Sequence, residues 1–336
     1  MSAPSRGYRR LALGTGLATF ALIVLGGVVR VSDSGLGCGP AGSGVQGWPL
    51  CNGDIVPGVE LTSIIEFSHR ALASIVGIMM LALAVLALRR YRAHRGLVRA
   101  SVAAGGLVLA QGLLGAATVE KDLDELLVAT HLGLAMILLA LLLYVYRASK
   151  PEVIGAPAED GGPRFRLLSL AASAAIFATI VAGGYMAGTQ NYGRADYRPG
   201  DGAHHACGKE FPTCNGDFMP FGQARLVDIH LTHRALMYLA TILVVALAVV
   251  ALRRRRSPGL VRGAWVALGL LAAQVLLGAL NVWLDESRVL IAAHLTLGTL
   301  LWGHLVGMRW TLYPVPAPGR AESRERAQSG AEAVAA

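Results

Sequence analysis

Long uncharged stretches alternate with short polar segments along this chain of 336 residues. Each stretch can supply the roughly 20 helical residues that cross a hydrocarbon core ~30 Å thick. A soluble helix keeps a polar face, whereas these stretches are apolar on every side. The pattern predicts eight membrane-spanning helices, one for each of the uncharged or nearly uncharged stretches 11–29, 71–88, 100–118, 126–146, 167–193, 235–252, 263–284 and 289–308.

The second half of the chain repeats the first. "EFSHRALASI" (66–75) aligns with "HLTHRALMYL" (230–239), and "GLVRASVAAGGLVLAQGLLGA" (96–116) aligns with "GLVRGAWVALGLLAAQVLLGA" (259–279). Four spans in each copy give both copies the same orientation, related by an axis along the membrane normal. We therefore predict an all-α integral membrane protein, built as two tandem, parallel-related four-helix bundles.

Composition shifts suggest where these units begin and end. The segment "SKPEVIGAPAEDGGPRF" is rich in Pro, Gly and Ala, and the residues after about Tyr313 have a composition typical of disorder. The expected divisions are an N-terminal bundle at 1–150, a cytoplasmic linker at 151–165, a C-terminal bundle at 166–313 and a disordered cytoplasmic tail at 314–336.

Basic residues gather in alternate loops and in both tails, as in "RRYRAHR" (89–95) and "RRRR" (253–256). The positive-inside rule places these segments and both termini in the cytoplasm, and it places the cysteine-bearing loops outside. The same rule accounts for the formal charge of +9, so no nucleic-acid partner is needed. We expect a multi-pass protein of the cell membrane, with lipid as its surroundings.

Four histidines occupy equivalent places in the two repeats: His69 and His131 in the first, His233 and His294 in the second. Each lies one to two turns inside the outer end of an even-numbered span, so each repeat offers two imidazoles at one depth. A histidine within a membrane usually faces a partner inside the bundle. Two neutral imidazoles facing each other across a four-helix bundle can ligate a heme iron from both sides.

We therefore favour two heme-type sites, side by side towards the outer face, over four unrelated structural histidines. Zinc is disfavoured, because the only carboxylate or thiol near that depth is Glu66. Conduction of electrons across the bilayer would need one heme near each face, which the histidine depths do not provide.

The repeats differ three residues before the first histidine, where Glu66 stands in one copy and His230 in the other. A carboxylate beside a heme pocket can exchange protons during oxidation of a bound substrate. The structural alternative for Glu66 is an interfacial pair with Arg70, and for His230 a hydrogen-bonded interfacial residue is favoured. Arg70 and Arg234 follow the ligand histidines and could pair with heme propionates or extend to lipid phosphate.

Cysteines occur only in the outer loops, Cys38 with Cys51 and Cys207 with Cys214. An intraloop disulfide in each is the simplest assignment in an oxidising compartment, and a redox-active pair that relays electrons is the alternative. The "HHAC" segment (204–207) could also hold zinc or copper together with Cys214.

Small and amide side chains suggest where helices meet. Gln111 and Gln274 are expected to bond between helices, and Gly26, Gly27, Gly105 and Gly106 are expected to allow close helix contact.

The chain resembles the heme A synthases, integral membrane enzymes of cytochrome oxidase assembly. The resemblance is carried by "GGVVRVSDSGLGC" (26–38), "GWPLCNG" (47–53), "EFSHRALAS" (66–74), "ATHLGLA" (129–135), "LTHRALMYLA" (231–240) and "AAHLTLG" (292–298). It implies oxidation of the methyl group at position 8 of heme O to a formyl group by successive hydroxylations, giving heme A. It also implies heme b as a cofactor, an electron donor and heme O synthase as partners, and leaves a homo-oligomer open.

The resemblance also implies a role for each site residue. Glu66 matches the catalytic glutamate, and His69 and His131 match the ligands of the substrate heme iron. His233 and His294 match the axial ligands of the heme b iron. The pairs Cys38–Cys51 and Cys207–Cys214 match the family's outer cysteine pairs, although the insertion "GPAGSGVQ" (39–46) widens the first spacing.

Two other protein classes share part of these features. A non-catalytic diheme electron carrier, or a quinol-oxidising cytochrome b-type subunit, would use the histidines without needing Glu66. A transporter of two parallel repeats would have broken helices and ionisable groups at the midplane, and neither is evident. We therefore expect a membrane oxidoreductase, with the roles of His204, His205 and His230 left open.

Overall fold

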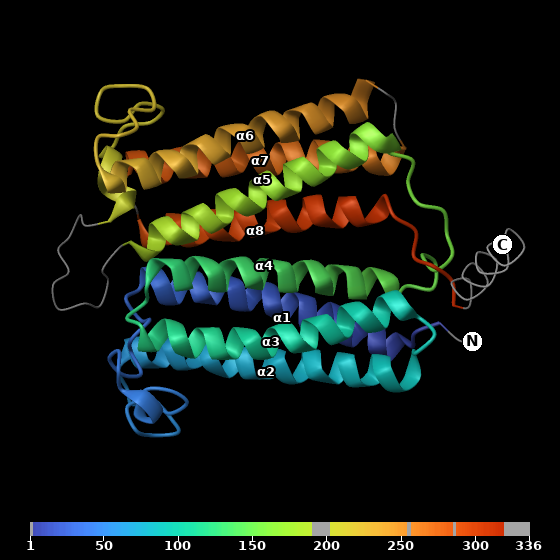
Figure 1. Cartoon of the computed structure of the whole chain (residues 1–336), viewed down its shortest axis with the longest axis horizontal. Coiled ribbons are helices and arrows are strands. Elements are labelled where there is room, and N and C mark those ends of the chain that lie inside the picture. Colours follow the sequence, from blue (N-terminus) through green and yellow to red (C-terminus); the bar gives the residue numbers. More distant parts are fainter. Residues whose placement is uncertain (1–2, 190–201, 254–256, 285–286, 319–336) are drawn as a thin grey trace, which may run out of the picture.

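The computed structural model describes residues 3–189, 202–253, 257–284 and 287–318. Within them, eight helices run side by side, and each is long and apolar enough to cross a membrane (Figure 1). Their bounds are α1 Arg6–Val31, α2 Leu61–Arg90, α3 Arg95–Glu120, α4 Glu125–Ala148, α5 Gly162–Gly188, α6 Arg225–Arg253, α7 Pro258–Trp283 and α8 Arg288–Thr311. The prediction of an all-α protein with eight spans is confirmed.

Most helices extend beyond the uncharged stretches that predicted them. α2 begins at Leu61 rather than near residue 71, so Glu66 and His69 lie well inside the helix. Charged side chains at helix ends reach the interfacial region and need not end the helix there. α5 ends at Gly188, before the predicted residue 193, and residues 190–193 fall outside the described part of the chain.

Side-chain caps define several helix starts. Ser5 accepts a hydrogen bond from the Tyr8 N–H, and Ser257 accepts one from the Leu260 N–H. Asp124 accepts from two N–H groups in the first turn of α4. These caps satisfy amide groups that the first turn of a helix leaves unpaired.

The helices pack in two similar rings. α1 contacts α2 and α4, and α3 contacts α2 and α4; α5 contacts α6 and α8, and α7 contacts α6 and α8. Between the rings, α4 contacts α5 and α8, and α1 contacts α8. Figure 1 shows α1–α4 together below α5–α8, with the short helices η1 (Gly44–Gln46) and η2 (Ala203–Cys207) beyond one end of the bundle. The exact division into two bundles stays a prediction.

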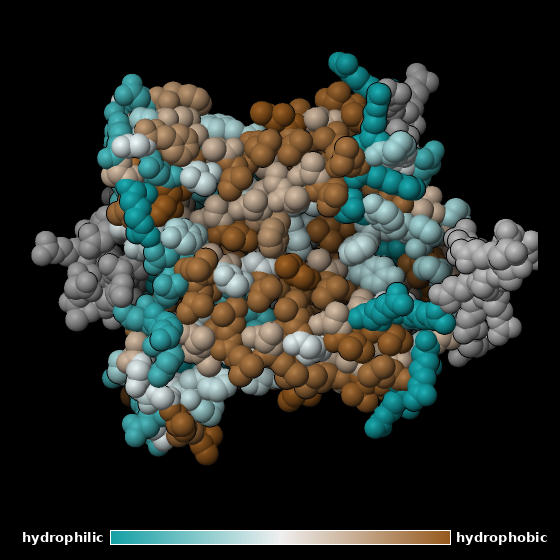
Figure 2. Space-filling view, viewed as in Figure 1, coloured by the Kyte–Doolittle hydropathy of each residue, from teal (hydrophilic) through white to brown (hydrophobic). Residues whose placement is uncertain are grey.

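Large apolar side chains cover the outside of the bundle. Leu17, Ile78 and Leu113 are 63%, 69% and 70% exposed, a degree of exposure that water would penalise and lipid tails would not. Figure 2 shows hydrophobic residues as a broad band across the middle of the visible face, with polar residues towards both ends. The chain is therefore a multi-pass membrane protein.

The segment between α4 and α5 packs against the end of α8. The Gly155 N–H donates to the Val315 carbonyl at 2.8 Å, and the Glu159 N–H donates to the Thr311 carbonyl at 2.9 Å. Val315 is buried, so residues 314–318, expected at the start of a disordered tail, belong to the packed structure. Residues 319–336, the rest of that expected tail, fall outside the described residues.

Candidate functional site

A cavity of about 660 Å³ lies between the two rings of helices, towards the end that carries the disulfide loops. Its walls are mostly apolar, and residues from both halves of the chain line it. The polar groups in its wall include the four expected ligands and the expected catalytic carboxylate: His69, His131, His233, His294 and Glu66. The two histidine pairs therefore border one continuous space.

Each of the four histidines faces a glycine on the preceding helix. A Cβ atom added to the glycine would lie 3.0 to 3.4 Å from the imidazole Cε1 in all four cases. The facing pairs are Gly26 with His69, Gly115 with His131, Gly183 with His233 and Gly278 with His294. Real Cβ contacts of 3.0 to 3.1 Å are rare, so a larger residue at Gly26, Gly183 or Gly278 would displace the facing imidazole, whereas 3.4 Å at Gly115 is an ordinary contact.

The glycines singled out from the sequence thus behave differently from one another. Gly26 and Gly27 do allow close contact between helices, and Gly105 lies against Ala84. The prediction is wrong for Gly106, because a Cβ there would meet nothing within 4 Å. Gly115 and Gly278 were missed, although the repeat alignment pairs them.

The imidazoles differ in what holds them. His233 Nδ1 donates to the Thr179 carbonyl at 3.0 Å, which leaves Nε2 as the free lone pair. Ligand histidines in metalloproteins are commonly oriented by such a bond. Among the described residues, Nδ1 of His69, His131 and His294 is buried with no hydrogen-bond partner.

Two equivalent glutamines contact the histidines of α4 and α8. The Gln111 amide donates to the backbone carbonyl of His131 at 2.9 Å. Gln274 Nε2 lies 3.1 Å from His294 Nε2, so its amide donates to the lone pair that a metal would use. The prediction that both glutamines bond between helices is confirmed.

Glu66 lies between the cavity and the first disulfide loop. Its Oε2 accepts a hydrogen bond from the Cys38 N–H at 2.7 Å, and its Oε1 pairs with Arg70. The residue is only 3% exposed. The pair with Arg70 exists, but Glu66 also lines the cavity, so the carboxylate is held in reach of anything bound there.

Arg70 and Arg234 hold the two outer loops in the same way. Arg70 donates to the carbonyls of Gly47 and Leu50 at 2.6 and 3.0 Å. Arg234 donates to those of Glu210 and Thr213 at 2.7 and 2.8 Å. The second member of each cysteine pair follows these carbonyls, so each arginine fastens one loop to its helix. Their pairing with heme propionates stays a prediction.

Both outer loops contain a disulfide bond, Cys38–Cys51 in the first and Cys207–Cys214 in the second. Within the described part of the chain, no three metal-ligating side chains gather into a metal site. The metal alternative for the "HHAC" segment therefore gains no support.

His230 and His204 link η2 to the cavity. His230, the counterpart of Glu66, donates from Nδ1 to the Ala203 carbonyl at 2.8 Å, in keeping with a structural role. His204 lines the cavity, and burial lowers its pKa well below the ordinary value. His204 is therefore neutral at pH 7, a property that the sequence left open.

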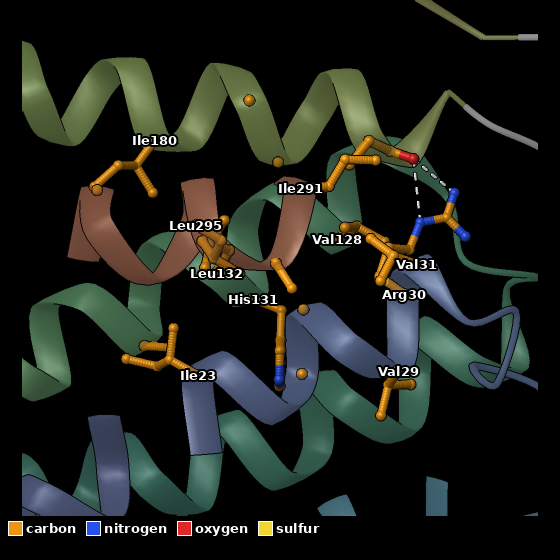
Figure 3. Close-up of a pocket in the computed structure, with 18 of the residues that line it drawn as sticks. Ile23, Val29, Arg30, Val31, Val128, His131, Leu132, Ile180, Ile291 and Leu295 are labelled. Atoms are coloured by element: carbon orange, nitrogen blue, oxygen red, sulfur yellow. Dashed lines mark hydrogen bonds between the residues drawn. The ribbon is translucent and has the colours of Figure 1, made fainter. Parts of the chain in front are cut away.

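Arg30 joins the two halves of the molecule and was missed in the sequence. Its Nε and Nη2 donate to the Ala187 carbonyl, near the end of α5, at 3.1 and 2.7 Å (Figure 3). A cation at this end of a helix also interacts favourably with the helix dipole. The sequence does contain a feature that could have pointed to Arg30, because this charged residue directly follows the uncharged stretch 11–29.

Comparison with known proteins extends this picture to both halves. A family model described as cytochrome oxidase assembly protein (COX15-CtaA) matches residues 59–306, which include all four histidines and Glu66. The chain belongs to this family. The match begins just before α2 and ends within α8, so it covers α2 to α7 and most of α8, and α1 and the first disulfide loop lie before it.

Individual members of the family are similar over most of their length. The heme A synthase of Symbiobacterium thermophilum is 29% identical over 321 residues, 92% of this chain and 97% of the relative. That of Halalkalibacterium halodurans is 30% identical, over 71% of this chain and 74% of the relative. That of Geobacillus kaustophilus is 28% identical, over 89% and 90%.

Proposed function

We propose that this chain is a heme A synthase, a membrane oxidoreductase that converts the C8 methyl group of heme O to a formyl group. The observation that carries the proposal is one apolar cavity bordered by two histidine pairs and a single buried carboxylate. Membership of the cytochrome oxidase assembly family, and relatives named heme A synthase across both halves, support it.

Heme O is the substrate at His69 and His131 in this proposal. Glu66, whose counterpart in the second repeat is His230, stands at this pair, where C–H bonds of the substrate methyl group are broken. Glu66 is the group that accepts or delivers protons during these steps, because the Cys38 N–H and Arg70 hold the carboxylate at the cavity wall. Apolar walls exclude water from the reacting methyl group.

Heme b is the resident cofactor at His233 and His294. These residues fit such a group once the Gln274 amide turns away from His294 Nε2: His233 is oriented by Thr179, and Gly183 and Gly278 leave room for both imidazoles. When bound, heme b supplies one-electron transfer. The bond from His233 Nδ1 to the Thr179 carbonyl fixes one imidazole of this pair, which suits a permanent ligand.

The orientation in the membrane belongs to the same proposal. The disulfide loops face outwards and both termini face the cytoplasm, since basic residues gather at the ends of helices opposite these loops. Heme O reaches the cavity from the lipid or from heme O synthase. Each hydroxylation takes its oxygen atom from a dioxygen-derived oxidant, whose second oxygen atom is reduced to water with electrons from a donor.

Pigment analysis tests the proposal. The protein is purified from cells that make heme O, and its extracted pigments are identified by mass spectrometry in wild type, Glu66→Gln and the control Glu60→Gln, an exposed carboxylate at the start of the same helix. Wild type and Glu60→Gln should yield heme b with heme A or its hydroxylated precursor, and Glu66→Gln should retain heme O. Wild type that holds two heme b per chain and never heme A would instead indicate an electron carrier.

A further inference from the structure

A second set of glycine contacts joins the two histidine pairs across the middle of the molecule. On α1 and on α5, the glycine that accommodates an imidazole is followed directly by another glycine, Gly27 or Gly184. Each of these second glycines lies against a leucine from the opposite half, Gly27 against Leu295 and Gly184 against Leu132.

One path of contacts leads from the N-terminal pair to the C-terminal pair. Leu132 follows His131 in α4, and a Cβ added at Gly184 would lie 2.9 Å from Leu132 Cδ2. Gly183, next to Gly184, faces the imidazole of His233, whose Cε1 would lie 3.1 Å from a Cβ added to Gly183. His131 and His233 are thus separated by two peptide links and two close contacts.

The second path of contacts leads from the C-terminal histidine pair back to the N-terminal pair. Leu295 follows His294 in α8, and a Cβ added at Gly27 would collide with Leu295 Cδ2. Gly26, next to Gly27, faces the imidazole of His69, whose Cε1 would lie 3.1 Å from a Cβ added to Gly26. The two paths together connect all four imidazoles in pairs, each pair spanning both halves.

Both leucines also border the cavity and pack against the same buried cluster. Figure 3 shows Leu132 and Leu295 in the middle of the view, with His131 below them and the backbone of α5 above. A glycine has no side chain of its own, so each leucine tip lies directly on the glycine backbone and a shift of the leucine presses on that backbone. That backbone carries the glycine against which the next imidazole rests.

We propose that Leu132 and Leu295 are positioning residues that couple the two tetrapyrrole sites, so that the position of the imidazoles in one half affects heme affinity in the other. The identity of the bound groups rests on the proposed function. The coupling itself rests on the contacts of four glycines with two leucines and two histidines, which occur twice in equivalent places of the repeats.

The test adds a methyl group to a glycine of the C-terminal half and measures heme binding at the histidine pair of the N-terminal half. Full-length protein is purified with its resident heme, hemin is added, and the Soret absorbance gives the dissociation constant of the second heme. His131→Ala, which should abolish this second binding, assigns the signal. Gly184→Ala should weaken it about fivefold or more, the lower end of typical coupling between sites.

A matched control and a rescue accompany this variant. Gly269→Ala adds the same methyl group to a C-terminal helix where it would meet nothing within 4 Å, and it should leave the dissociation constant unchanged. Adding Leu132→Ala to Gly184→Ala makes room for the new methyl group. The double variant should bind the second heme more tightly than the two single effects predict, as a double-mutant cycle measures.

The reverse direction uses α1. Gly27→Ala should change the electron paramagnetic resonance spectrum of the resident heme, while Gly16→Ala, whose added Cβ would meet nothing within 4 Å, should not. If the glycine variants cannot be purified, Leu295→Ala, which creates space instead of a clash, should still weaken binding of the second heme.

The outcomes separate this proposal from the proposed function. If the wild-type protein binds no heme at either histidine pair, the proposed function fails. If heme binds at both pairs but Gly184→Ala and Leu132→Ala act additively, or Leu295→Ala leaves the second site unchanged, the two sites are independent and the coupling is wrong while the function stands.

Discussion

The two halves use equivalent histidines, yet single residues around them give each site a different chemical environment. Thr179 orients His233 through its carbonyl, while the carboxylate of Glu66 stands three residues before His69. Where the first half has that carboxylate, the second has His230 bonded to the Ala203 carbonyl. The C-terminal pair therefore contains an imidazole oriented by a backbone carbonyl, and the N-terminal pair has a buried carboxylate beside it, which is the difference on which the proposed roles rest.

His204 should make the protein less stable in mild acid. Burial holds the pKa of His204 well below the ordinary value of about 6.5. Below about pH 6.5 this histidine is therefore protonated in the unfolded chain while it stays neutral in the folded chain. The stability it contributes is complete above about pH 6.5 and is lost as the pH falls towards the folded pKa, by at most about 1.4 kcal/mol per pH unit. Thermal unfolding in detergent at pH 7.5 and 5.5 should show a smaller loss for His204→Asn than for wild type; equal losses would contradict this.

At the scale of helices, glycines set how closely an imidazole approaches its neighbouring helix. Gly278→Ala should displace His294, because the added Cβ would lie 3.0 Å from its Cε1. Overpacking of about 1–3 kcal/mol corresponds to roughly 5- to 150-fold weaker heme retention. Heme per chain, measured by absorbance after purification, should fall in Gly278→Ala and remain at the wild-type level in Gly269→Ala on the same helix. Equal heme content in both variants would show that the contact does not matter.

The outer loops depend on arginines that project from the even-numbered helices. Arg234 is buried and donates to three loop carbonyls, so Arg234→Gln should cost on the order of 2–3 kcal/mol and loosen the loop that contains Cys207 and Cys214. Limited proteolysis of the intact protein should cut this loop faster. Arg225→Gln on the same helix breaks an exposed pair with Glu125 and should cost less than about 1 kcal/mol. Similar cleavage rates in the two variants would show that Arg234 does not hold the loop in place.

At the scale of the whole molecule, Arg30 fastens one half to the other. Arg30→Ala removes two hydrogen bonds to the Ala187 carbonyl and a cation from the end of α5, which should lower stability by about 2–3 kcal/mol. Thermal unfolding in detergent checks this. The control Arg288→Ala breaks a largely exposed pair with Asp33, which also joins α8 to the end of α1, and should cost less than about 1 kcal/mol. If both variants lose the same stability, Arg30 contributes no more to holding the two halves together than an exposed ion pair does.

Sequence reasoning reached the spans, the repeat and the candidate histidines, because each leaves a local or periodic trace. It missed Arg30 and the facing glycines Gly115 and Gly278, since a glycine within a helix has the same local appearance whether its neighbour is an imidazole or open lipid. Gly106 illustrates the same limit, because it lies one residue from a real contact and makes none within 4 Å.

The sequence by itself determined the number of helices and the common depth of the four histidines. Hydrophobic length and a rise of about 1.5 Å per residue are properties of each segment alone. Only the tertiary structure decided that the imidazoles border one cavity, that Glu66 is tied to the first disulfide loop, and that Leu132 and Leu295 lie against glycines of the opposite half. These facts depend on how far each helix is rotated about its axis, and that rotation is set by packing between segments far apart in the chain.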